Sequence, residues 1–400
     1  MRKRGIKKIM FLLLASITAI SLLILAVIFT SSGVFTASKY LEPWTPGYSQ
    51  QFDDPRIQLA AHGLLSANGH NLQPWHIRLD KEDPKVFYLY ADSRRLAREV
   101  DPWARQTMIS QGTFLEYVRV AGEKLGYSTA IELFPEGDYD EKNLTGSMDS
   151  KPVAKIILTK TTPLNSPLYS YMFLPDTNRN AYLDARLTNE QVSQIAGISG
   201  VGDITMTIRV YQDTKDIRKL ENYVLEGANI ESRVHRINEE SAAIFRANEF
   251  QKNKYRYGFS LEGQGTSGFM KHIMQGLITI VPSINSEKAS ADLFVQSTRT
   301  AIEHTPAYAM IISKGNSREE QVGAGMLYSR LVLTAHEMGL VMQPVSQVLE
   351  EYPEMNEQYS SIHSEYAMMG TTIQMFLRLG QPAKDTPLTM RRDVMDVIIR

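Results

Sequence analysis

The sequence predicts an α+β protein preceded by one N-terminal transmembrane helix. Three observations lead to this fold class. An uncharged apolar run occupies residues 9–30, helix-like and strand-like segments are mixed along the rest of the chain, and one pattern of a helix followed by a strand occurs twice. The chain has 400 residues and is 43% hydrophobic, which is ample for packed cores. The part beyond the apolar run is therefore expected to be globular.

The apolar run is long enough to cross a bilayer. At about 1.5 Å of rise per residue, about 20 residues cover the hydrocarbon layer, whereas a cleavable signal has an apolar region of about 7–15 residues. A cleaved signal remains the alternative, because residues 36–38 are small, although Phe35 stands where a second small residue is usual. We predict a basic tail at 1–8, a membrane anchor at 9–30 and a tether at 31–54.

The charges before the apolar run predict its orientation. Five basic residues and no acidic one lie within residues 1–8. By the positive-inside rule this end stays in the cytoplasm, so the main domain is expected on the extracytoplasmic side of a single-pass membrane protein.

Composition excludes several classes of function. The chain has no cysteine, which removes disulfides, thiol nucleophiles and cysteine-ligated metals. Without the five basic residues of the tail, 38 of the 43 Lys and Arg remain against 44 Asp and Glu, a net charge of −6 that does not favour nucleic-acid binding. The histidines show no metal-ligand spacing, so we predict no metal site.

The local patterns place the elements of the globular part. Helices are expected at 56–65, 106–126, 188–196, 216–232, 237–251 and 321–339. Strands are expected at 75–79, 86–90, 154–158 and 374–379, and the first two should pair across the turn at 80–85. Residues 261–282 mix glycines with apolar side chains and could be a lid, a membrane-surface segment or an ordinary helix and loop.

A repeated spacing of glycines indicates an internal duplication. Gly112 precedes Gly126 by 14 positions, and Gly325 precedes Gly339 by 14 positions, with apolar residues at matching places between them. Each helix is followed some 30 residues later by a strand-like run. The two halves would be 55–165 and 166–400. Any two buried helices with small-residue contacts could share such a pattern, so this alternative stays open.

Residues 68–75, NGHNLQPW, carry the most informative motif. They place two amides and an imidazole in a loop just before a strand, where these groups could form hydrogen bonds with a planar ligand. Such amides can equally form hydrogen bonds with the backbone of a local turn. The motif resembles the S-x-x-N-x-Q-P-W signature of the nitroreductase superfamily of flavin enzymes, especially its long single-chain subfamily with two nitroreductase-like halves.

Further segments resemble that subfamily in the same order. Residues 92–112 resemble the end of its first half, and 177–182, TNRNAY, resemble the start of the second half, where an R-x-S/T-x-R segment meets the flavin phosphate. Residues 339–346 resemble the Gly-Leu strand that passes beside the flavin ring. Residues 379–382 and 391–394 resemble its closing tail. The resemblance covers about residues 55–400.

The resemblance implies a nitroreductase-like fold, duplicated as a pseudo-dimer within one chain, that binds FMN. It implies that side-chain amides form hydrogen bonds with the edge of the flavin ring and that guanidinium and hydroxyl groups bind the phosphate. The flavin would carry the chemistry, so no protein side chain is predicted as catalytic. The cofactor-binding residues implied in this way are Asn71, Gln73, Thr177, Arg179, Ser346, Arg391 and Arg392.

One departure from the family pattern keeps two functions open. Pro175 stands where the family has an arginine, and Asp176 adds a carboxylate to a phosphate-binding segment. The first prediction is an FMN-dependent oxidoreductase that takes electrons from NAD(P)H or a membrane-borne reductant and passes them to a small planar acceptor. The alternative is a non-catalytic, membrane-anchored module that binds a flavin or another ligand in a degenerate cleft.

Overall fold

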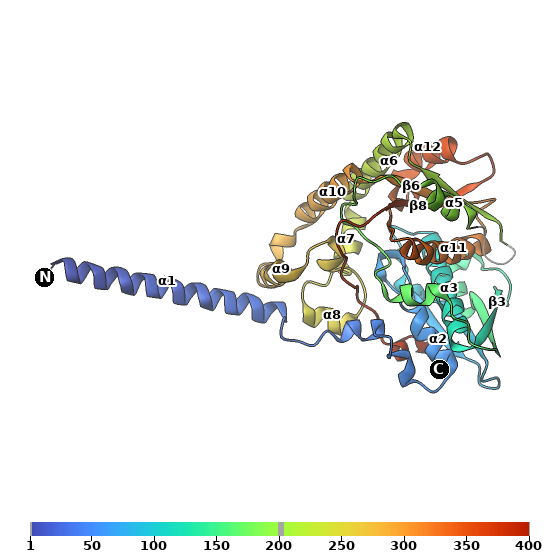
Figure 1. Ribbon diagram of the computed structural model, residues 1–400, viewed down its shortest axis with the longest axis horizontal. Coiled ribbons are helices and arrows are strands. Elements are labelled where there is room, and N and C mark those ends of the chain that lie inside the picture. The colour runs from blue at the N-terminus through green and yellow to red at the C-terminus, as the bar shows by residue number, and fades with distance from the viewer. Residues whose placement is uncertain (1, 199–203, 400) are drawn as a thin grey trace.

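A long helix projects from an α+β body in the computed structural model, which describes residues 2–198 and 204–399 (Figure 1). This helix, α1 (Arg2–Ser32), is solvent-exposed from Ile6 to Val27 and first becomes buried at Ile28. Residues Ile6–Ser32 are the one helix of the described chain that is long and apolar enough to cross a membrane. The predicted N-terminal helix is therefore present, and it could serve as an anchor or as a signal sequence.

The first sheet confirms the predicted hairpin. β1 and β2 pair antiparallel, with Trp75 opposite Ala91, and the Asp80 carboxylate accepts backbone N–H groups of the connecting turn. The strand order is β3-β4-β2-β1-β9. Its strands are β1 (Trp75–Leu79), β2 (Val86–Ala91), β3 (Tyr127–Leu133), β4 (Ala154–Lys160) and β9 (Ile398–Ile399).

The second sheet repeats the strand order of the first. Its order is β5-β6-β8-β7, which read from the β7 edge is β7-β8-β6-β5. This is the order β3-β4-β2-β1 of the first sheet with four added to each strand number. All of these neighbouring pairs are antiparallel in both sheets. β9, from the end of the chain, runs parallel to β1 and so returns to the first sheet. The strands are β5 (Met206–Tyr211), β6 (Ala307–Ser313), β7 (Val341–Pro344) and β8 (Thr372–Gly380).

Two central helices, α3 (Arg105–Leu125) and α11 (Arg318–Glu337), pack against each other (Figure 1). Their backbones meet at the glycines that the sequence singled out, Gly112 and Gly325. A Cβ at Gly112 would lie 2.8 Å from the backbone nitrogen of Met326 and closer still to the carbonyl oxygen of Val322. A Cβ at Gly325 would lie 2.9 Å from the backbone nitrogen of Thr113 and closer still to the oxygen of Ile109. The contact is reciprocal, and only glycine permits it on either side.

The remaining helices surround the two sheets. They are α2 (Pro55–Gly63), α4 (Leu144–Ser150), α5 (Asn189–Gly197), α6 (Thr214–Arg233), α7 (His235–Ala243), α8 (Glu249–Tyr255), α9 (Gly268–Ile280), α10 (Glu287–Glu303) and α12 (Asn356–Tyr366). The expectation of one helix over 237–251 is wrong. The chain leaves the helix at Ile244, Phe245 bridges to Phe259, and the Asn248 side chain caps a new helix by accepting the Gln251 N–H.

The segment at 31–54 packs closely on the body. Trp44 is buried, and its indole Nε1 donates to the Thr389 carbonyl oxygen at 2.7 Å. The buried Tyr48 hydroxyl accepts the Val394 N–H at 3.0 Å. These contacts join the residues after α1 to the C-terminal segment, so α1 is held by structured contacts and not by a loose spacer.

Candidate functional site

The motif loop at 68–74 has an unusual backbone. His70, Asn71 and Gln73 have φ values of 53°, 51° and 53°, in the left-handed region that non-glycine residues seldom adopt. The Asn68 side-chain oxygen accepts the Gln73 N–H at 2.7 Å and closes the turn. Such residues cost on the order of 1–3 kcal/mol each and persist where the surroundings fix them, which often happens at functional sites.

This loop meets the C-terminal segment through direct hydrogen bonds. The Asn71 side-chain oxygen accepts from Arg391 Nη1 at 3.1 Å. Gln73 Oε1 accepts the backbone N–H of Arg392 at 2.8 Å, and the Gln73 carbonyl accepts from Arg392 Nη1 at 3.2 Å. Four of the predicted site residues, separated by about three hundred positions in sequence, are thus neighbours.

The departure at Asp176 has a structural partner. Its carboxylate accepts from Arg391 Nη2 at 3.2 Å, and the two side chains are only 11% and 1% exposed. Other donors of Arg391 reach the carbonyls of Leu65 and Met390, and its guanidinium lies 4.5 Å from the Trp44 ring. Burial lowers the pKa of Arg391, which the charge of Asp176 partly offsets. The positive charge of Arg391 is therefore balanced by the carboxylate of Asp176 inside the protein.

The two motif amides are also occupied. Asn71 Nδ2 donates to the carbonyls of Gly258 and Met390, both at 3.2 Å. Gln73 is fully buried, and its Nε2 donates to the Arg256 carbonyl at 2.8 Å. The segment that joins α8 to the turn before α9 therefore lies on the loop and uses donors that the resemblance assigns to a flavin ring.

Thr177 and Arg179 have a different environment. Arg179 is exposed, its Nη1 donates to the Gly263 carbonyl at 3.3 Å, and it forms no ion pair with any described residue. Desolvation by the surrounding protein lowers its pKa, and the charge of Asp176 partly offsets this effect. Burial, followed by the charge of Arg179, lowers the pKa of the half-buried His70 to about 4. We call the neighbourhood of Arg179, with His70, Gly263 and the nearby Thr177 of the same segment, the Arg179 recess.

A pocket of about 390 Å³ adjoins the recess at His70. Its volume is in the range of small-molecule sites. Arg95 lines it, donates to the Leu72 carbonyl at 3.1 Å and lies 4.2 Å from the Tyr257 ring. Burial would raise the pKa of Asp92, another lining residue, but hydrogen bonds from His76 and Arg94 outweigh it and the pKa is lowered.

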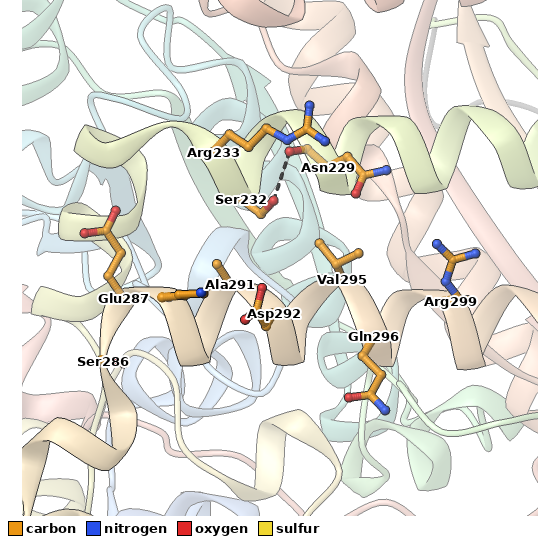
Figure 2. Close-up of a pocket in the computed structure, with 11 residues that line it drawn as sticks. Asn229, Ser232, Arg233, Ser286, Glu287, Ala291, Asp292, Val295, Gln296 and Arg299 are labelled. Carbon is orange, nitrogen blue, oxygen red and sulfur yellow. Dashed lines mark hydrogen bonds between the residues drawn. The ribbon is translucent and has the colours of Figure 1, made fainter.

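Ser346 lies apart from the other predicted residues. Its hydroxyl exchanges hydrogen bonds of 3.3 Å with the backbone of Phe376 and bonds to none of the other predicted site residues. A larger hollow, of about 760 Å³, lies between α6 and α10 (Figure 2) and contains no predicted residue. Its lining contains charges of both signs, from Arg233, Glu287, Asp292 and Arg299. It therefore lacks the set of hydrogen-bond donors pointing at one place that a phosphate needs.

These contacts decide where FMN fits. Its phosphate needs donors that the protein does not already use, and the exposed Arg179 guanidinium has N–H groups beyond the Nη1 that donates to Gly263, whereas the Thr177 hydroxyl contacts Tyr328. Arg391, Arg392 and Gln73 are buried and bonded within the protein, and the amide of the half-buried Asn71 is bonded as well. The sequence did not predict that His70 lies near Arg179 and is neutral. It also did not predict the ion pair between Asp176 and Arg391, although it showed the unusual carboxylate at position 176. The described residues contain no His, Asp and Glu cluster able to hold a metal.

No protein-family model matches the chain, and no curated protein matches it. Several solved structures are similar. The nitroreductase-like family protein from Bacillus cereus has 13% identity and a TM-score of 0.31, over 60% of this chain and 96% of that one. The FMN-dependent nitroreductase NfnB from Mycobacterium smegmatis, in complex with NADPH, has 15% and 0.31 over 52% and 84%. Nitroreductase with bound FMN from Bacteroides fragilis has 11% and 0.31 over 57% and 95%.

These solved structures are of nitroreductase-like flavoproteins, and the likeness to them has a TM-score of 0.31 at 11–15% identity. At this level of identity and TM-score, the similarity carries no argument about cofactor or activity. Those depend on the residues of this chain.

Proposed function

We propose that the chain is a membrane-tethered flavoprotein of the nitroreductase type, with FMN bound at the Arg179 recess. One observation carries the proposal. The motif resemblance assigns three segments, 68–75, 177–182 and 391–394, to a single cofactor, and residues in them or directly beside them are neighbours in space. Asn71 bonds Arg391, Arg391 pairs with Asp176, and the charge of Arg179 acts on His70.

The duplicated architecture is part of the proposal. The shared strand order of the two sheets and the reciprocal crossing of α3 and α11 support two related halves, 55–165 and 166–400, that form a pseudo-dimer. β9 then exchanges from the second half into the first sheet. The recess lies where a segment of the second half, 177–179, meets the motif loop of the first.

The residues of the recess define the binding step. The Arg179 guanidinium and the Thr177 hydroxyl would hold the phosphate through charge-assisted hydrogen bonds. His70 is neutral at pH 7, so it offers one donor and one acceptor without adding charge. When bound, the flavin supplies the hydride and electron chemistry. The donor would be NAD(P)H or a membrane-borne reductant, and the acceptor a small planar molecule.

The N-terminal helix sets the location in this proposal. The basic tail at 1–8 stays in the cytoplasm, α1 remains as an anchor, and the body lies outside. A membrane-borne reductant suits that side better than a pyridine nucleotide, which is a cytoplasmic metabolite.

A second function is favoured by a specific observation. Asp176 neutralises Arg391, and the carbonyls of Arg256 and Gly258 occupy the amides of Gln73 and Asn71. A site with so few open donors could hold a flavin, or another flat anion, without catalysing its turnover. The chain would then be a non-catalytic binding module.

The test is a visible spectrum of the full-length protein, purified in detergent with FMN and then desalted. Flavin absorption bands are expected in the wild type and in Arg299→Gln, a matched control on exposed α10, and not in Arg179→Gln. A colourless wild type with no flavin-induced thermal stabilisation would overturn the proposal. If flavin is bound, re-oxidation of the photoreduced protein by a quinone supports the enzyme, and its absence supports the binding module.

A further inference from the structure

The free length of α1 matches the thickness of a bilayer. Residues 6–27 have exposed side chains, and Ile28 is the first that the body buries. Beyond the basic tail at 1–8, the 19 residues from 9 to 27 extend about 29 Å, and the hydrocarbon layer is about 30 Å thick. One face of the bilayer therefore falls close to Ile28, where the body begins.

α9 crosses α1 at that level. A Cβ at Gly276 would lie 2.8 Å from the carbonyl carbon of Ile28 and closer still to its oxygen, so the two backbones touch. The rings of Phe29 and Phe269 are 5.1 Å apart. Figure 1 shows α9 on the side of the body from which α1 projects. α9 is thus held at the level where the membrane surface lies.

The outward side of α9 and of the turn that follows it is apolar. Phe269, Met270, Ile280, Val281 and Ile284 are each at least 42% exposed, and Phe35, just beyond α1, is 85% exposed. We call these six residues the α9 apolar face. α9 itself contains no acidic residue. A soluble protein seldom leaves such a group of large apolar side chains in water.

The polar side of α9 is fixed to the body. Lys271 lies 3.3 Å from Glu249 Oε1 and 3.1 Å from Glu262 Oε1, and Gln275 Nε2 donates to Glu249 at 3.0 Å. The buried Lys252 pairs with the same two carboxylates, and the Tyr40 hydroxyl donates to Glu249. This network prevents α9 from turning its apolar face inward.

We propose that the α9 apolar face lies in the interface of the bilayer that α1 crosses, as a second membrane contact beside the anchor. Amphipathic helices bind in this way, with the apolar side at the boundary of headgroups and acyl chains. The inference rests on α1 being retained as a membrane helix.

The chain has no cysteine, so single cysteines can be introduced and labelled without background. We would label Met270→Cys and Ile284→Cys on the apolar face and Leu14→Cys inside the anchor with an environment-sensitive fluorophore. The matched control is Met369→Cys, an exposed methionine between α12 and β8, which lie away from α1 (Figure 1). The full chain is reconstituted in phosphatidylcholine vesicles with brominated acyl chains.

Labels at positions 270 and 284 are expected to show blue-shifted emission and loss of intensity in brominated lipid. The label at position 369 is expected to show neither the shift nor the loss. Lipid quenching at 14 with none at 270 and 284 would overturn this inference and leave the anchor intact. No lipid quenching at 14 would overturn the anchor, and this inference with it. Neither outcome depends on flavin binding, so each is distinct from failure of the recess.

Discussion

Substitution of Gly112 by alanine should destabilise the protein through the crossing of α3 and α11. The new Cβ would lie within 3.0 Å of two backbone groups of α11, and backbone atoms cannot rotate away as a side chain can. The helices must therefore separate, and overpacking of this kind typically costs about 1–3 kcal/mol, occasionally more. Alanine gains roughly 1 kcal/mol over glycine in helix propensity. Because the clashing atoms are backbone, we expect the upper end of the overpacking range, so the net loss should be on the order of 2 kcal/mol.

The reciprocal contact predicts a similar loss for Gly325→Ala and a sub-additive loss for the double variant, because the first separation makes room for the second methyl group. Gly197→Ala is the matched control, since this exposed residue of α5 has no neighbouring atom within 4 Å of the added Cβ. The assay is urea unfolding of the full chain in detergent. A loss for Gly112→Ala no larger than that for Gly197→Ala would show that close packing of α3 on α11 at this glycine does not stabilise the protein.

Three further predictions concern buried charges. Asp176→Asn leaves Arg391 buried without a counter-ion, so it should lower the free energy of unfolding by about 3 kcal/mol, and equal losses for it and the exposed control Asp184→Asn would contradict the pairing. Burial raises the pKa of Glu231 to about 7 and that of Asp101 to about 6. The native state then keeps protons that the unfolded chain releases, so stability should fall as the pH rises from about 4 to 7. Glu231→Gln should reduce that fall by on the order of 1 kcal/mol, measured by urea unfolding at pH 5 and pH 8, and an unchanged difference would count against it. Lys252 and further partners outweigh burial and lower the pKa of Glu249 to about 2. Its contribution is complete above about pH 4.5 and lost as the pH falls towards 2, so Glu249→Gln should weaken the acid transition seen by circular dichroism, and an unchanged acid midpoint would disprove this role.

Local pattern predicted much of the fold. The hairpin at 75–91 follows from two β-rich runs around a polar turn, and the ends of α3 and α11 follow from helical spacing and glycine. The two glycines at the crossing were visible because small residues at matched positions are unusual in otherwise bulky helices. The break between α7 and α8 was not visible, because the bridge from Phe245 to Phe259 is a tertiary contact.

The site was less accessible to prediction. A motif names residue types, but it does not show which partners they find. The amides of Asn71 and Gln73 bond to main-chain carbonyls, and a carbonyl has no sequence signature. The pair of Asp176 and Arg391 spans 215 positions in the chain. The roles of all seven predicted residues in holding a cofactor stay predictions, and Arg179 is the one of the seven that is exposed to solvent.

The most direct test of the account compares two ligands that differ only in the phosphate, FMN and riboflavin. Dissociation constants of the full-length protein would be measured by flavin fluorescence for the wild type and for Arg179→Gln. A charge-assisted bond of about 1.5–3 kcal/mol predicts that the wild type prefers FMN by roughly 10- to 100-fold, and that the variant loses this preference while riboflavin binding is unchanged. Equal affinity of the wild type for both ligands, or no binding of either, would contradict the account.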